Sequence, residues 1–134
     1  MGPIRRFLAM MVGTPVDPPP ALVARYPELA TVCWRRGGLP TRVGGWALGS
    51  ASVAAITLWR TVFLAPDTPF AAELLLHELA HVQQFEDSRA FPVRYLWESA
   101  RVGYSSNRYE VEARRFAAAR MQSAAPASPP LQEA

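Results

Sequence analysis

Lysine is absent from the chain and cysteine occurs only once, at Cys33. A single cysteine can form neither an intrachain disulfide nor a cysteine-based zinc cage, so neither device stabilises this fold. We expect Cys33 to be a buried, unreactive thiol, and its isolation favours a reducing, cytoplasmic location. All 14 basic residues are arginines, scattered from Arg5 to Arg120. Because nucleic-acid binding needs a basic stripe with interleaved aromatic residues, we expect no nucleic-acid partner.

Long apolar runs are also missing. The run from Phe7 to Val12 is too short to cross a membrane, and no small-residue cleavage site of a signal peptide precedes Pro15. We expect this run to pack against the core, the alternative being an element that lies on a membrane surface. Residues 71–82 are interrupted by two histidines and two glutamates, so the sequence predicts no stable membrane span. It does not indicate an oligomeric state.

Length and composition predict one globular domain. A chain of 134 residues is long enough for one core but not for two, and half of its residues are apolar while 19% are charged. Residues 1–122 are therefore expected to form a single domain. Residues 123–134 are rich in alanine, proline and serine and have little to bury, so we expect them to form a disordered tail.

The pattern of residue types predicts an α+β fold. Segments rich in valine, isoleucine, threonine and tryptophan are typical of short strands, and we expect a small, mostly antiparallel sheet. Strands are predicted at residues 31–36, 41–48, 52–59 and 61–64. Helices are predicted at residues 22–26, 69–87, 92–101 and from 106 or 107 to 122, with a proline-rich loop at residues 14–20. Thr68 is the expected N-cap of the second helix, and Gly103 is the expected stop of the third.

His77-Glu78-Leu79-Ala80-His81 matches the H-E-x-x-H pattern of zinc hydrolases. Residues four apart lie above one another on a helix, so His77 and His81 can bind one metal ion. Glu78 projects beside that ion, where it can take a proton from a metal-bound water. The alternative is a hydrogen-bonded core cluster. The metal is favoured because these are the only two histidines, and polar groups in an apolar helix are costly unless something satisfies them.

A catalytic zinc site needs a third protein ligand, which here must be a carboxylate. Glu86 lies too far along the same helix to reach the metal. Glu98, Glu110 and Glu112 remain, and the last two lie on a later helix that can pack beside the first. Glu110 has another interpretation, because residues 107–110 have the spacing of a capping box in which the glutamate closes the helix N-terminus. That role would leave Glu112 as the ligand.

Residues 75–84, together with residues 109–113 and 116–117, resemble the gluzincin metallopeptidases, a group of zincin proteases. The resemblance is greatest to small bacterial zincin-like domains with an HELxHVxQ helix, and it covers about residues 61–119. It implies a zincin-like fold, peptide-bond hydrolysis of a peptide or protein substrate, and Glu110 as the third Zn²⁺ ligand. Arg114 stands where such proteins often carry Asp or Asn, so a partner that orients a histidine is either missing or comes from elsewhere, and Glu112 stays an alternative ligand.

Hydrolysis also needs a donor for the developing oxyanion. Tyr104, in the loop after Gly103, is the expected donor. The competing donors are Tyr95, Tyr109, Arg101 and Arg108. Residues 52–64 precede the H-E-x-x-H helix and can present a sheet edge to an extended peptide. The competing function is a catalytically inactive zincin-like domain that binds metal or a protein partner.

Overall fold

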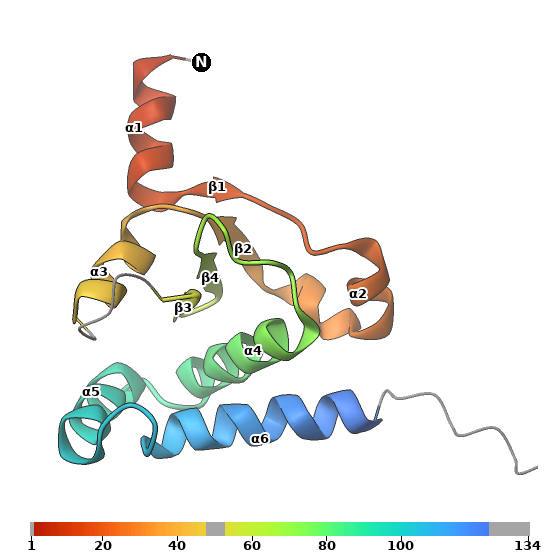
Figure 1. The fold of residues 1–134 in the computed structure, drawn as a ribbon, viewed down its shortest axis with the longest axis vertical. Coiled ribbons are helices and arrows are strands. Elements are labelled where there is room, and N and C mark those ends of the chain that lie inside the picture. Colours follow the sequence, from red (N-terminus) through yellow and green to blue (C-terminus); the bar gives the residue numbers. More distant parts are fainter. Residues whose placement is uncertain (1, 48–52, 124–134) are drawn as a thin grey trace, which may run out of the picture.

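The computed structural model describes residues 2–47 and 53–123 of the chain, and it has the expected α+β architecture. A four-stranded sheet lies against helix α4, and helix α6 runs along another side of α4 (Figure 1). The helices are α1 (Pro3–Val12), α2 (Pro20–Arg25), α3 (Leu39–Ala47), α4 (Ala72–Asp87), α5 (Phe91–Val102) and α6 (Arg108–Ser123), with a 3-10 helix η1 (Pro27–Thr31). The strands are β1 (Thr14–Pro15), β2 (Cys33–Arg36), β3 (Ala55–Leu58) and β4 (Thr61–Leu64).

The sheet is mixed, with the strand order β1-β2-β4-β3. Two of its pairings are antiparallel, as expected, but β2 and β4 in the centre are parallel. The hairpin of β3 and β4 turns through Trp59, which adopts a positive φ of 55°. Because β4 is the strand that pairs with β2, β3 lies at the edge of the sheet, next to α4.

The strand predicted at residues 41–48 is wrong, because the chain forms helix α3 there. Gly44 explains why a helix fits. A Cβ atom at Gly44 would lie 2.1 Å from Cδ1 of Ile56, so with any other residue the Ile56 side chain would have to shift for α3 to approach β3 this closely. Tertiary packing thus overrides the local preference of the valine, threonine and tryptophan in this segment. Leu48 lies outside the described residues.

The N-terminal helix α1 contains no buried residue, so the expectation that residues 7–12 pack against the core is wrong. The C-terminal end of the helix contacts α3, and there the Arg35 side chain donates to the carbonyl oxygens of Val12 and Gly13 at 2.6 and 3.1 Å. Cys33 is exposed rather than buried, because Trp34, its neighbour in β2, takes the inward-facing position. None of the helices in the described part of the chain is long and apolar enough to cross a membrane.

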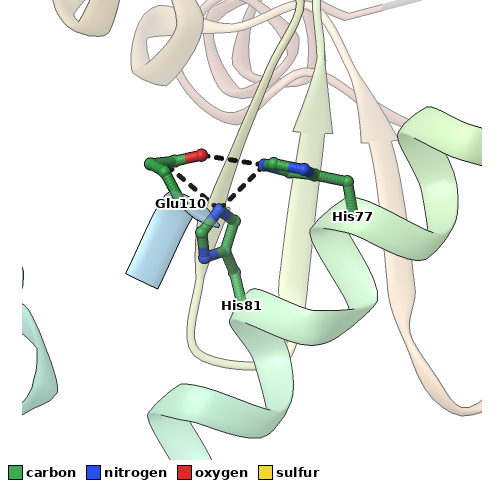
Figure 2. A group of neighbouring side chains, drawn as sticks. All are labelled: His77, His81 and Glu110. Atoms are coloured by element: carbon green, nitrogen blue, oxygen red, sulfur yellow. Dashed lines mark hydrogen bonds and ion pairs between the residues drawn. The ribbon is translucent and has the colours of Figure 1, made fainter. Parts of the chain in front are cut away.

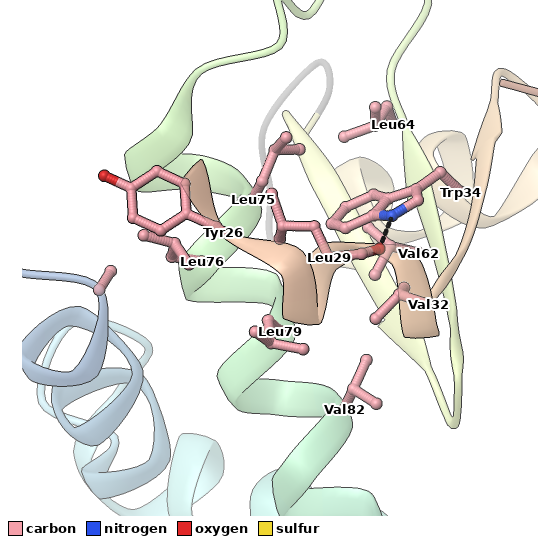
Figure 3. Close-up of a cluster of buried hydrophobic side chains, with 11 residues drawn as sticks. Tyr26, Leu29, Val32, Trp34, Val62, Leu64, Leu75, Leu76, Leu79 and Val82 are labelled. Carbon is pink, nitrogen blue, oxygen red and sulfur yellow. Dashed lines mark hydrogen bonds between the residues drawn. The ribbon is translucent and has the colours of Figure 1, made fainter. Parts of the chain in front are cut away.

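The hydrophobic core lies between the sheet and α4, as Figure 3 shows. Leu75, Leu79 and Val82 are spaced at i, i+4 and i+7, so they form one face of α4 directed at the sheet. Their partners come from the first half of the chain and from β4: Tyr26, Leu29, Val32, Trp34, Val62 and Leu64. The opposite stripe of α4 is therefore free to carry polar side chains.

The three long helices match the predicted positions closely. Helix α4 ends at Asp87 as expected but begins at Ala72, because the Thr68 hydroxyl donates to the carbonyl of Ala54 instead of capping the helix. Helix α5 ends at Gly103, which has a positive φ of 83°. Helix α6 reaches Ser123, the first residue of the predicted tail, and residues 124–134 lie outside the described residues.

Candidate metal centre

Helix α4 directs a second stripe of residues away from the core. Leu74, His77, Glu78, His81 and Phe85 follow one another at helical spacing, and all of them line a cleft. Glu78 and His81 are each 6% exposed, whereas His77 is more accessible. The H-E-x-x-H residues are thus displayed together at the floor of one cavity, as the motif predicts.

Helix α6 brings Glu110 to the two histidines. Nε2 of His77 lies 2.9 Å from Oε2 of Glu110, and Nε2 of His81 lies 3.1 Å from Oε1. In Figure 2 the two imidazoles leave α4 one turn apart and point at the carboxylate from α6. Glu110 faces α4 because it shares the buried face of α6 with Ala113 and Ala117, whose small side chains let the helices approach closely. One potential ligand atom from each residue lies within 4.8 Å of the others.

The other acidic candidates do not join this cluster. Glu112 is exposed on α6, Glu98 pairs with Arg101, and Glu86 pairs with Arg60. Glu110 does not have the capping role either. The N-cap of α6 is Asn107, whose Oδ1 accepts the backbone N–H of Tyr109 at 2.9 Å, and the N–H of Asn107 itself donates to Tyr104.

Gln84 fixes the orientation of His81, a role that the sequence interpretation did not include. The amide nitrogen of Gln84 donates to the carbonyl of Tyr109 at 3.0 Å, so its Oε1 faces Nδ1 of His81 at 2.7 Å as an acceptor. His81 must therefore carry a proton on Nδ1. Its Nε2 is left to face the cluster. Two signals were available: Gln84 is the last residue of the HELxHVxQ pattern, and it lies three residues after His81 on the same helix.

This arrangement favours a positive charge among the three side chains. Nε2 of His81 lies 3.2 Å from Nε2 of His77 and close to the carboxylate of Glu110, so a proton or a cation is needed between them. Burial opposes ionisation of Glu110, but its hydrogen bonds with His77 and His81 hold the pKa well below its usual range. Burial also opposes the charged form of His81, yet the bond to Glu110 raises its pKa above the usual value. Two imidazoles and a carboxylate are a donor set that fits zinc.

We expect Gln84→Leu to lower the affinity of this cluster for zinc by about 10- to 100-fold, because the acceptor that orients His81 is lost. Competition with a chromogenic chelator measures the affinity. Gln84→Glu keeps the acceptor for His81 but loses the donor to the carbonyl of Tyr109, so it should retain only part of the binding. Gln83→Leu is the matched control, since Gln83 is adjacent and exposed. Equal affinities in Gln84→Leu and Gln83→Leu would contradict this role.

Glu78 is held from the sheet side. The hydroxyl of Thr57, on β3, donates to Oε2 of Glu78 at 2.7 Å. The sequence interpretation placed the edge strand correctly but did not identify this threonine. One carboxylate oxygen of Glu78 is thereby fixed, so the side chain has a defined orientation in the cleft.

Two tyrosines flank the cluster, and the hydroxyls of both interact with the carboxylate of Glu110. The hydroxyl of Tyr95 donates to Oε1 of Glu110 at 2.6 Å, and burial together with this carboxylate raises its pKa. Tyr104 lines the same cleft, and burial and the nearby charges of Glu110 and Glu78 raise its pKa to about 12. Tyr104 is therefore protonated at neutral pH and can donate a hydrogen bond into the cleft. Tyr109 instead accepts from Arg108 at 2.6 Å.

The cleft has a volume of about 970 Å³. The β3 segment lines one part of it, and the α5 residues Phe91, Pro92, Tyr95 and Leu96 line another. Such a volume is in the range of sites that hold a ligand of several residues or a small organic molecule. The chain is short, yet it forms a substantial cavity beside the cluster.

Residues 29–89 match the family model of the eCIS core domain. The match covers less than half of the chain, from η1 to just beyond α4. His77, Glu78 and His81 lie inside the part similar to the eCIS core domain, whereas Tyr104 and Glu110 lie outside it. The match does not support the expected zincin resemblance, which still rests on the motif. No curated protein and no solved structure gives a significant match to the chain.

Proposed function

We propose that this protein is a zinc-dependent metallopeptidase, a hydrolase whose zinc ligands are His77, His81 and Glu110. The observation that supports this most strongly is the convergence of their ligand atoms within 4.8 Å. The cluster lies beside Glu78, in the same cleft. Three protein ligands from two helices would leave one position of a bound zinc ion for water or substrate, as in catalytic rather than structural zinc sites.

Zinc bound here would supply Lewis acidity, which lowers the pKa of water and polarises a carbonyl group. Glu78 is the general base that takes the proton from the attacking water and passes it to the leaving amine. Thr57 holds one of its oxygens at 2.7 Å, so the carboxylate is oriented before substrate binds. Tyr104 donates to the oxyanion that develops on the carbonyl oxygen, a role that its raised pKa of about 12 permits.

Strand β3 offers the substrate a backbone to pair with. The N–H of Ala65 donates to the carbonyl of Ala54 at 2.9 Å, and hydrogen-bonded pairs alternate along an antiparallel ladder. Ala55 and Thr57 therefore direct their backbone N–H and C=O groups away from β4, toward the edge that no described strand covers. An extended peptide can add to this edge beside Glu78.

The test is cleavage of a peptide library by the purified protein with and without its metal. We expect cleavage by the zinc-loaded protein, loss of cleavage after treatment with a zinc chelator, and recovery when zinc is restored. Mass spectrometry of the products measures the outcome. The competing function is an inactive metal-binding or protein-interaction domain. It predicts that chelation lowers the melting temperature while no peptide is cleaved at any zinc concentration, and that result would refute the proposal.

A further inference from the structure

The charges that line the cleft are unevenly distributed. Three of its described lining residues, Glu73, Glu78 and Glu110, are acidic, and Arg114 is the one arginine that lines it, beside the two histidines of the cluster. Two of these acids already have partners, since Glu110 contacts both histidines and Glu78 accepts from Thr57. Apart from a cation held by His77, His81 and Glu110, the positive group that an anionic ligand would meet in the cleft is the guanidinium of Arg114.

Arg114 is held in position without being neutralised. It lies one helical turn after Glu110 on α6, and its Nη2 donates to the carbonyl oxygen of Ser105 at 2.6 Å. This bond joins Arg114 to the loop that carries Tyr104. Arg114 forms no ion pair with any residue in the described part of the chain, whereas Arg60, Arg101 and Arg120 each pair with a glutamate. The Ser105 bond uses one donor, so most of the guanidinium fork remains available.

We propose that Arg114 forms a carboxylate-binding subsite of the cleft, and that the ligands of this cleft are peptides whose free C-terminal carboxylate ends inside it. A guanidinium binds a carboxylate through two parallel hydrogen bonds, a geometry that no other described group lining the cleft can offer. An internal peptide segment carries no such charge. As a substrate class, this inference rests on the proposed peptidase function and predicts cleavage near the C-terminus, but the binding preference itself requires no cleavage.

The apolar walls suggest which side chains the peptide should carry. Leu58, Phe85, Phe91 and Leu96 line the cleft on both sides of the polar floor. A peptide with large apolar residues before its carboxylate therefore complements both the walls and Arg114. We take the N-acetylated tripeptide Ala-Leu-Phe as the probe, and its C-terminal amide as the matched ligand that lacks only the charge.

The experiment measures binding of both probes by calorimetry to the zinc-loaded Glu78→Gln protein, in which cleavage is suppressed. We expect the free acid to bind about tenfold more tightly than the amide, because a hydrogen bond to a charged group at a partly exposed site raises the affinity by about that factor. Arg114→Gln should abolish this preference, and Arg114→Lys should restore only part of it. Arg115→Gln is the control, since Arg115 is exposed on the same helix and does not line the cleft. It should retain the full preference.

Two results would overturn the subsite. One is equal binding of acid and amide to the protein with Arg114 intact. The other is an equal loss of affinity for both probes in Arg114→Gln, which would mean that Arg114 contacts the peptide backbone or supports the loop instead. A separate cleavage assay on the protein with Glu78 intact distinguishes this inference from the proposed function. A preference for the acid with no cleavage would refute the peptidase and leave the subsite standing.

Discussion

Glu78→Gln should bind zinc as tightly as the natural protein and lose its peptide-cleaving rate by about 10²- to 10⁴-fold, the contribution typical of a general base. The reason is that glutamine fills the same space and can still bond to Thr57, but it cannot accept a proton from water. Glu78 is not one of the clustered ligand atoms, so its replacement should leave zinc content unchanged. Zinc analysis and steady-state cleavage of a peptide substrate, measured on the same preparation, test both halves of the prediction.

Glu73→Gln is the matched control for this variant. Glu73 lies on the same helix, lines the same cleft and carries the same charge, but it is exposed and does not belong to the cluster. A carboxylate in the first turn of a helix interacts favourably with the helix dipole, so the loss of Glu73 should change stability slightly and catalysis by less than tenfold. Full activity in Glu78→Gln would remove the general base from the mechanism.

Local patterns predicted the parts of the site that lie on one helix. His77, Glu78 and His81 could be placed on a common face from their spacing alone, and the structure has them there. Glu110 could not be chosen over Glu112 from spacing, because that choice depends on which face of α6 packs against α4. In the structure, the buried face of α6 contains Ala113 and Ala117, and Glu110 lies on this same face.

Contacts between distant elements were the parts that the sequence did not predict. Thr57 bonds to Glu78 across the boundary between β3 and α4, and Gln84 bonds to Tyr109 between α4 and α6. Gln84 belongs to the HELxHVxQ pattern, but the pattern does not identify its partner, and no motif marks Thr57. The resemblance left open which residue orients a histidine when Arg114 replaces an acid or amide, and Gln84 has that position for His81.

The same limit applies to the fold. Strand β4 spans the predicted residues, and α5 and α6 lie within a few residues of their expected ends. Helix α3 was mistaken for a strand because the decisive contact, between Gly44 and Ile56, joins elements that the local pattern does not relate. The parallel pairing of β2 with β4 is likewise a property of how the hairpin is inserted into the sheet. Local composition contains no information on either arrangement.

Glu110→Gln should lower the zinc affinity by more than about 100-fold. This loss exceeds the one expected when the changed residue only orients a ligand by a hydrogen bond, as Gln84 does. The charged oxygens of Glu110 lie 2.9 and 3.1 Å from the two imidazole nitrogens, and a glutamine oxygen is a neutral and poorer ligand. Glu112→Gln removes the same charge two residues later on the same helix, where the side chain is exposed. It should bind zinc as the natural protein does, and chelator competition distinguishes the two variants.

The two variants should also differ in how zinc changes their stability. A ligand that binds only the folded state stabilises it by about 2.7 kcal/mol when its concentration is 100 times its dissociation constant. Zinc should therefore raise the melting temperature of the natural protein and of Glu112→Gln, and raise that of Glu110→Gln much less at the same concentration. If Glu112→Gln lost the zinc effect and Glu110→Gln kept it, the third ligand would be Glu112 and not Glu110. Because Glu110 contacts both histidines, such a result would require α6 to rotate against α4, and the buried alanines at their interface oppose that rotation.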